Sequence, residues 1–185
     1  MERFASQGYH PTSVTDITDG LGVAKGVFYW YFESKDELFG EIVADALRSM
    51  RQARREAIAG EHDPARRIEQ GIRSSLRWLA EHRHLFVLLE FARTEERFAP
   101  IVRQGDQQTV ADALPHVSAG ITAGLLRGED PVVLTLAILG VTAHLARVLV
   151  LERGDDPDRV AESVIAFCRQ GYVAGNVPTL ERRIA

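Results

Sequence analysis

The chain is poor in cysteine and in long uncharged segments, and each shortage excludes a class of protein. Cys168 is the one cysteine among 185 residues, so no disulfide can form within the chain and a reducing compartment such as the cytoplasm is expected. The longest uncharged run covers 131–146, which is shorter than the roughly 18 apolar residues that a membrane-spanning helix requires. We therefore expect no membrane partner, and the N-terminus shows no signal-peptide pattern.

The sequence motifs of the common enzyme classes are also missing. The chain has no glycine-rich phosphate loop, no Gly-x-Ser-x-Gly elbow and no His-Glu-x-x-His pair. His82 and His84 are two positions apart, so their side chains would diverge on a helix and make a poor metal pair. We therefore expect no enzyme, no metal site and no cofactor other than a small-molecule effector.

Lysine is scarce as well, and its placement is uneven. The net charge of −4 argues against a protein that simply coats nucleic acid. Arginine supplies nearly all of the 22 basic residues, while the two lysines, Lys25 and Lys35, flank a run of five aromatic residues. This placement marks residues 25–35 as a candidate binding segment.

Apolar residues recur at spacings of three and four along almost the whole chain, which predicts an all-α protein. Three boundaries repeat one formula, in which a glycine precedes an aspartate and a proline, at 60–64, 128–131 and 154–157. Glycine suits the end of one helix, aspartate the N-cap of the next, and proline its first position. The predicted helices cover a segment ending near Gln7, then about 13–20, 25–32, 34–59, 64–82, 84–94, 96–126 with a break near Gly105 or Pro115, 131–152 and 157–175.

Two short predicted helices joined by a glycine-containing turn lie near the N-terminus. Ser13 opens a capping-box pattern at the start of the first helix, and Gly22 supplies the tight turn before the second. Val14, Ile17 and Leu21 recur at helical spacing, and we expect them to be buried. This arrangement is typical of a helix-turn-helix.

The second of these helices crowds five aromatic rings into consecutive positions. Phe28 and Phe32 are four residues apart and share a face, which we assign to the core. Tyr29, Trp30 and Tyr31 then point outward, where their hydroxyl and indole groups can meet phosphate and sugar. The alternative is that all five rings are core and that the neighbouring lysines are simply solvated.

The flanking residues favour contact with DNA. Lys25 begins one predicted helix and Lys35 begins the next, and the free N–H groups of helix N-termini attract phosphate. Val27 lies near the start of its helix, where its methyl groups can meet thymine methyls in the major groove. Phosphate contacts of this kind set the register of the protein on the duplex, while base contacts supply specificity.

The segment GYHPTSVTDITDGLGVAKGVFYWYFESKDELF, Gly8 to Phe39, resembles the DNA-binding domain of the tetracycline-repressor (TetR) family. The matching motifs are Gly8-Tyr9, Thr12-Ser13-Val14, Ile17, Gly22-Val23-Ala24-Lys25-Gly26, the aromatic run 28–32, and Ser34-Lys35-Asp36-Glu37-Leu38-Phe39. The rest of the chain is similar to the family only in its layout, as a variable helical ligand-binding domain.

The resemblance implies a dimeric regulator of transcription, usually a repressor, that binds a palindromic operator in double-stranded DNA and responds to a small-molecule effector. The DNA contacts that it implies are Thr12, Ser13 and Lys35 for phosphate, Lys25 and Gly26 at the helix start, Val27 for a base edge, Tyr29 and Trp30 for phosphate and sugar, and Tyr31 for the groove.

The sequence also departs from the family pattern. Val27 stands where a polar residue is frequent, and Trp30 where a polar or basic residue is frequent. The family's first helix usually runs for well over ten residues before the Gly-Tyr pair, whereas here only 1–7 precede it. We expect either that the natural start lies upstream of Met1 or that most of this helix is lost.

The expected fold is therefore an N-terminal three-helix DNA-binding domain with a truncated first helix, followed by a C-terminal helical domain for ligand binding and dimerisation. The predicted boundaries are 1–40 for the DNA-binding domain, 41–59 for a linking helix and 60–185 for the ligand-binding domain. Dimerisation is expected through 131–152 and 157–175. The proposed seams are Leu134, Ile138, Val141, Leu145 and Val148 in the first, and Val160, Val164, Phe167, Gly171 and Tyr172 in the second. Alternatively, both seams are ordinary core within one chain.

An effector pocket is expected between the helices of 64–126 and helix 131–152. Its apolar candidates are Trp78, Phe86, Leu89, Phe91 and Phe98, and its polar candidates are His82, Arg93, His144 and Arg147. Aromatic residues at helical spacing are also typical of plain packing. A dimeric helical small-molecule binder that has lost DNA binding is the functional alternative to a repressor.

Overall fold

The computed structural model describes residues 2–172, and this part of the chain is helical without β-strands. Its elements are α1 (Glu2–Gln7), α2 (Val14–Leu21), α3 (Lys25–Tyr31), α4 (Lys35–Ala57), α5 (Pro64–Glu81), α6 (Arg83–Thr94), α7 (Ala99–Thr122), α8 (Pro131–Leu145), a π-helical continuation η1 (Ala146–Glu152) and α9 (Pro157–Tyr172). The all-α prediction and the order of its helices are confirmed.

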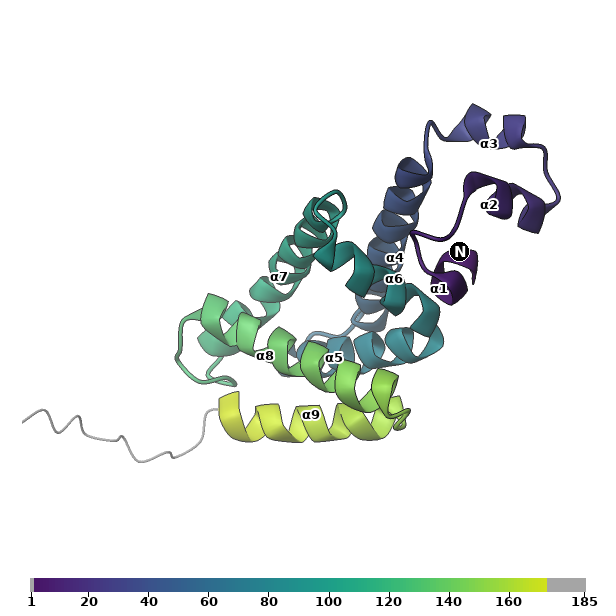
Figure 1. Cartoon of the computed structure of the whole chain (residues 1–185). Helices are drawn as coiled ribbons and strands as arrows, with labels where there is room; N and C mark the ends of the chain where they lie inside the picture. The colour runs from purple at the N-terminus through teal and green to yellow at the C-terminus, as the bar shows by residue number, and fades with distance from the viewer. Residues whose placement is uncertain (1, 173–185) are drawn as a thin grey trace, which may run out of the picture.

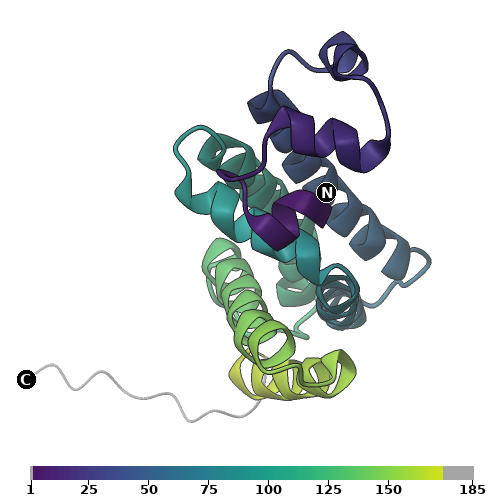
Figure 2. The same ribbon diagram turned by 45° about the vertical axis from the view of Figure 1, so that its right-hand side comes forward.

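The helices α2 and α3 lie at one end of the molecule, and α8 and α9 lie at the other (Figures 1 and 2). The long helix α4 begins beside α3 and runs into the body, where it packs against α5 and α7. A movement of α4 would therefore carry α3 with it.

Capping residues explain where most helices begin. The carboxylates of Asp63 and Asp130 accept hydrogen bonds from the first backbone N–H groups of α5 and α8, and Asp156 does the same for α9. The glycine of the repeated formula ends a helix in two cases, with φ of +82° at Gly60 and +79° at Gly154. At the third boundary this expectation is wrong, because the left-handed residue after α7 is Gly124 and not Gly128.

Helix α7 is continuous, so the predicted break near Gly105 or Pro115 is also wrong. Gly105 allows α7 to approach α4 closely. A Cβ atom at this position would lie 2.8 Å from Leu47 Cδ1, which is closer than real contacts allow.

Two hydrophobic clusters hold the fold together. One joins α5, α7, α8, η1 and α9, and includes Leu76 and Val164. The other joins α1 and α4 to α6 and the start of α7, with Phe4, Tyr9 and Phe39 among its members. The second cluster therefore spans the predicted boundary between 1–40 and the rest of the chain, and those domain limits stay a prediction.

Within the described residues, the stretch Pro131–Glu152 is long and apolar enough, by length and composition, to cross a membrane. The core helix of a soluble protein passes the same test. Here Leu134 and Ile138 are buried in the first cluster, and Arg147 Nη1 lies 2.6 Å from Glu152 Oε1 in the last turns. These contacts fit a helix that packs on its own chain.

Candidate DNA-binding surface and effector pocket

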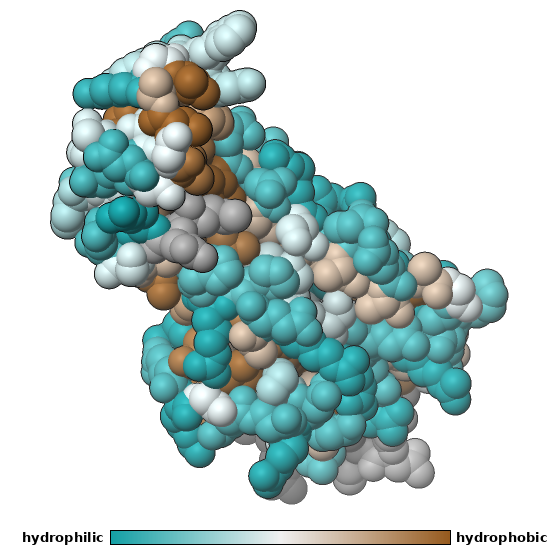
Figure 3. Space-filling model, turned by 90° about the vertical axis from the view of Figure 1, so that its right-hand side faces the viewer, coloured by the Kyte–Doolittle hydropathy of each residue, from teal (hydrophilic) through white to brown (hydrophobic). Residues whose placement is uncertain are grey.

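The outer face of α3 is a continuous patch of exposed rings. Phe28 is only 6% exposed, whereas Trp30 is 85% exposed and Tyr29 and Tyr31 are also exposed. Figure 3 shows hydrophobic surface gathered over the end of the molecule that α2 and α3 form. The expected burial of Phe28 and the exposure of the three outer rings are confirmed, whereas Phe32, also expected in the core, is only half-buried. Contact of these rings with DNA stays a prediction.

Helix α2 is fixed by its cap. The Ser13 side chain accepts from the Asp16 backbone N–H, and the Asp16 carboxylate accepts from the Ser13 N–H. The expectation that Leu21 is buried is wrong, because its side chain is 71% exposed and the buried position on this helix is Thr18. Leu21 therefore adds to the apolar surface beside α3.

The two lysines lie in different environments. Lys25 is exposed at the start of α3 and makes no hydrogen bond or ion pair with any described residue. The Lys35 ammonium is 3.0 Å from the carbonyl oxygen of Tyr9 and 2.9 Å from that of Thr12, and 4.3 Å from the centroid of the Tyr9 ring. Lys35 therefore holds the loop before α2, and its predicted contact with phosphate stays a prediction.

Thr12 also has a structural role. Its side chain is fully buried and its hydroxyl donates to the Gly8 carbonyl oxygen at 2.7 Å. This buried hydroxyl argues against a phosphate contact through the side chain, and the contact of Thr12 with phosphate stays a prediction. Ser13, Gly26 and Val27 are exposed and stay candidates.

One polar contact joins the DNA-binding segment to the rest of the protein. The Tyr9 hydroxyl donates to the Asp36 carboxylate, and Arg97 Nη1 lies 2.5 Å from the same carboxylate. These contacts hold the pKa of Asp36 below its ordinary value, the Tyr9 hydrogen bond having the largest effect, while burial and Asp36 raise the pKa of Tyr9. The Tyr9 ring stacks on Phe91, with centroids 5.2 Å apart.

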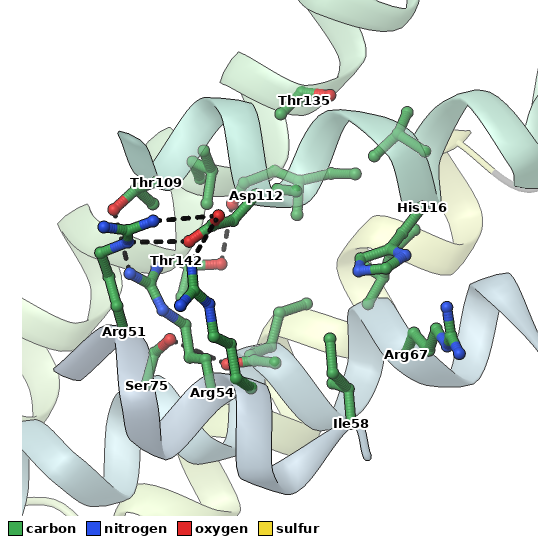
Figure 4. Close-up of a pocket in the computed structure, with 18 residues that line it drawn as sticks. Arg51, Arg54, Ile58, Arg67, Ser75, Thr109, Asp112, His116, Thr135 and Thr142 are labelled. Atoms are coloured by element: carbon green, nitrogen blue, oxygen red, sulfur yellow. Dashed lines mark hydrogen bonds and ion pairs between the residues drawn. The ribbon is translucent and has the colours of Figure 1, made fainter. Parts of the chain in front are cut away.

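A cavity of about 90 Å³ lies between α4, α5, α7 and α8 (Figure 4). Its apolar lining includes Ile58, Ile68, Ile72, Val117, Ile138 and Leu139. Its polar lining is dominated by arginine, and it consists of Arg51, Arg54, Arg55, Arg67, Ser75, Thr109, Asp112, His116, Thr135 and Thr142.

Asp112 is the acidic residue of this lining. Its carboxylate lies 2.8 Å from Arg51 Nε and 3.2 Å from Arg55 Nη2, and both guanidinium groups hold its pKa below the ordinary value, Arg51 more strongly. Burial lowers the pKa of His116, and Arg67 lowers it further. The cavity therefore carries an excess of positive charge.

None of the nine predicted pocket residues lines this cavity. Trp78, Leu89 and Phe98 are buried in the second hydrophobic cluster, so their helical spacing reflects packing. Arg93 Nη1 lies 2.6 Å from Asp106, and the Arg147 side chain pairs with Glu152. The remaining predictions, His82, Phe86, Phe91 and His144, also lie outside the cavity. The cavity beside α4 therefore differs from the predicted effector pocket, and the effector contacts stay a prediction.

Half of the described residues in the predicted dimer seams are buried within the chain, namely Leu134, Ile138, Val160 and Val164 of the first hydrophobic cluster. Val141, Leu145 and Val148 are half-buried, and Phe167 is 61% exposed. Positions 171 and 172 lie outside the residues whose burial is described. The exposed apolar face of these helices comprises Val132, Val133, Leu136 and Phe167. This α8–α9 face offers exposed apolar side chains for contact with a second chain.

Comparison with known proteins agrees with the geometry of the N-terminal helices. Residues 1–42 match the family described as "Bacterial regulatory proteins, tetR family". The "Probable acrEF/envCD operon repressor" of Escherichia coli (strain K12) is 34% identical over 82 residues, which are 43% of this chain and 36% of that protein. The chain thus matches only about a third of the length of the first curated relatives.

Longer matches extend over both halves of the chain. An "HTH-type transcriptional regulator YhgD" of Bacillus subtilis (strain 168), uncharacterized by its own description, is 26% identical over 169 residues, 83% of this chain and 81% of that protein. The structure of the fatty acid degradation regulator FadR from Bacillus halodurans shares the fold, with a TM-score of 0.82, 16% identity, and coverage of 92% of this chain and 90% of that one. The N-terminal segment 1–42 therefore matches the TetR family, and the described part of the chain shares its fold with the FadR structure. The family and these relatives are regulators of transcription and not enzymes.

Proposed function

We propose that the protein is a dimeric, DNA-binding regulator of transcription. It acts as a repressor that a small-molecule effector releases from its operator. The observation that carries this proposal is the exposed α3 face. A soluble protein gains nothing from an 85% exposed tryptophan between two exposed tyrosines unless a partner covers them. The TetR-family match of 1–42 supports double-stranded DNA as that partner.

The dimer would form through the α8–α9 face. Its apolar side chains Val133, Leu136 and Phe167 are exposed on adjacent helices, and a second copy would bury them in a four-helix contact. A twofold axis would set the two α3 helices about 34–36 Å apart, one turn of the duplex. A palindromic operator matches that symmetry.

The effector would act through the cavity beside α4. An effector shifts DNA binding only if it prefers the conformation with low DNA affinity. Since α4 both lines the cavity and follows α3 directly in the chain, a displacement of α4 would change the separation of the two α3 helices.

The test is fluorescence anisotropy with labelled duplexes from the region upstream of the protein's own gene, against random duplexes of equal length. We expect tighter binding to a palindromic upstream segment. Val27→Ala should reduce the preference for this segment more than it reduces binding to random DNA. Equal affinity of the unaltered protein for all duplexes, or no binding, would instead favour the helical small-molecule binder.

A further inference from the structure

The lining of the cavity has more positive than negative charges. Four arginines line it, three from α4 and one from α5, against the single carboxylate of Asp112. The chain as a whole has the opposite sign, with a net charge of −4. A local excess of this kind within an acidic protein favours an anion over a cation or a neutral molecule.

Among these arginines, Arg54 lacks a carboxylate partner. Its Nη2 donates to the Thr109 hydroxyl at 2.9 Å, whereas Arg51 and Arg55 both pair with Asp112. Burial holds the pKa of Arg54 below its ordinary value; the charge of Asp112 opposes this effect, while the neighbouring Arg51 and Arg55 add to it. A desolvated guanidinium with only a neutral acceptor is costly, and an incoming anion would offset that cost.

Apolar side chains make up much of the remaining lining. They are Ile68 and Ile72 of α5, Val117 of α7, and Ile138 and Leu139 of α8, with the hydroxyl groups of Ser75, Thr135 and Thr142 among them. Figure 4 shows Arg51 and Arg54 on the α4 side, with Asp112 and His116 projecting from α7. The lining can therefore pair with an anion through its arginines and pack an apolar group against the isoleucines of α5 and α8.

The unfilled cavity is small. Its volume of about 90 Å³ is well below the roughly 300–1,000 Å³ of typical ligand pockets. A ligand with a sizeable apolar part must therefore part α4 from α7 and α8. The polar contacts between α4 and α7, which include Arg51–Asp112, Arg55–Asp112 and Arg54–Thr109, would then have to yield.

We propose that the cavity binds an amphiphile with one anionic group, which pairs with Arg54, and an apolar body, which lies on the α5–α8 wall. The link from ligand binding to DNA binding rests on the proposed function. The binding of the ligand itself can be measured without DNA. The anionic group also competes with Asp112 for Arg51. Binding thereby loosens α4 from α7 and couples the ligand to the position of α3.

The test is calorimetric titration of the whole protein, without DNA, with straight-chain amphiphiles of four to twelve carbons. Each length is used as the carboxylate, the monoalkyl phosphate, the alcohol and the amine. We expect the carboxylate or the phosphate to bind at least about tenfold more tightly than the alcohol of equal length. The carboxylate and phosphate arms separate a fatty-acid-like source from a phosphate ester. Affinity should rise with chain length.

The matched variants are Arg54→Gln and Arg48→Gln. Arg48 lies on the same helix, outside the cavity, where its exposed side chain pairs with Glu41 and Asp45. We expect Arg54→Gln to lose about tenfold in affinity for the anion and little for the alcohol, while Arg48→Gln loses neither. If Arg54→Gln does not fold, Arg54→Lys keeps the charge without the planar fork and should still weaken anion binding.

Three results would overturn the proposal: an alcohol or amine that binds as tightly as the anions, an Arg54 variant with unchanged anion affinity, or no binding by any member of the series. DNA binding is measured separately by anisotropy. Retained anion binding with no operator binding would refute the proposed function alone, and the reverse would refute this inference alone.

Discussion

Arg51 of α4 and Asp112 of α7 form a two-point contact, with Nε 2.8 Å from Oδ2 and Nη2 3.1 Å from Oδ1. The contact closes one side of the cavity and fixes α4 in its present position. The Arg51 side chain is 18% exposed, so the pair is partly shielded from water. Its contribution to stability should therefore be measurable.

Asp112→Asn should lower the free energy of unfolding at pH 7 by about 1–2 kcal/mol, because Arg51 and Arg55 lose their charged acceptor. The folded-state pKa of Asp112 lies below its ordinary value of 3.8, so its stabilisation is present above that pH and is lost as the pH falls through the lowered pKa. Urea unfolding across pH 7 to 3 tests this. The exposed Asp19→Asn serves as control, and a constant difference between Asp112→Asn and the unaltered protein at all pH values would contradict the prediction.

Trp30→Ala and Phe28→Ala should separate DNA binding from folding. Trp30 is almost fully exposed, so its removal should change stability by less than about 0.5 kcal/mol while weakening operator binding. Phe28 is buried, and its removal should cost about 3 kcal/mol. Denaturation and anisotropy are measured on both variants. Unchanged operator affinity in Trp30→Ala would remove this ring from the DNA interface.

Lys25→Ala should change the salt dependence of DNA binding, whereas Lys35→Met should change the stability of the fold. Without Lys25 the plot of log affinity against log salt should flatten by about 0.9 per subunit, close to 2 for a dimer, with no loss of stability. Without the Lys35 ammonium the carbonyls of Tyr9 and Thr12 lose a charged donor, and stability should fall by about 1–2 kcal/mol. If the slope of log affinity against log salt changes in Lys35→Met and not in Lys25→Ala, then Lys35 contacts phosphate and Lys25 does not.

Leu136→Glu should convert a dimer to a monomer, because a carboxylate on the α8–α9 face would be buried unpaired in the contact. Phe167→Glu should act in the same way. Sedimentation velocity measures the result, and Val87→Glu, an equally exposed apolar position on α6, is the control. If both variants keep the sedimentation coefficient of the unaltered protein, the dimer contact lies elsewhere.

His116 should titrate below its ordinary pKa of 6.5 because of burial, with Arg67 lowering the pKa further and Asp112 opposing. Since protonation is disfavoured in the folded state, His116 should cost stability as the pH falls below 6.5. An anion in the cavity adds negative charge, so the His116 pKa should rise when octanoate is bound. NMR titration of its ring proton with and without octanoate measures both values; octan-1-ol is the control and should leave the pKa unchanged.

Local chemistry made most helix boundaries predictable. Asp63 followed by Pro64, and the capping serine Ser34 ahead of α4, specify starts that depend on neighbouring residues alone. The exposure of the α3 rings followed from the same short-range reasoning, because a single helix face cannot bury five consecutive rings.

Contacts between distant residues were less predictable. Helix α8 is apolar all round, so periodicity could not separate the buried Leu134 from the exposed Leu136. Lys35 reaches carbonyl groups more than twenty positions earlier, and no local pattern reports such a contact.

The pocket was missed for a similar reason, because it depends on α4 meeting α7. The available signal was the spacing of Arg51, Arg54 and Arg55, which places three guanidinium groups on one helix face. A second signal was Asp112 four residues before His116 on another helix. Choosing aromatic residues instead selected packing positions.

The aromatic cluster around Tyr9 also limits how this protein can be re-engineered. Phe4, Tyr9 and Phe39 pack against Phe91 and Phe98. Dividing the chain within α4, after Phe39, would therefore separate the aromatic rings that contact one another in this cluster. A chimera with the DNA-binding domain of another protein would have to rebuild this aromatic packing. Grafts that retain α1, Tyr9 and Asp36 from the host, and exchange only α2 and α3, would leave the joint intact.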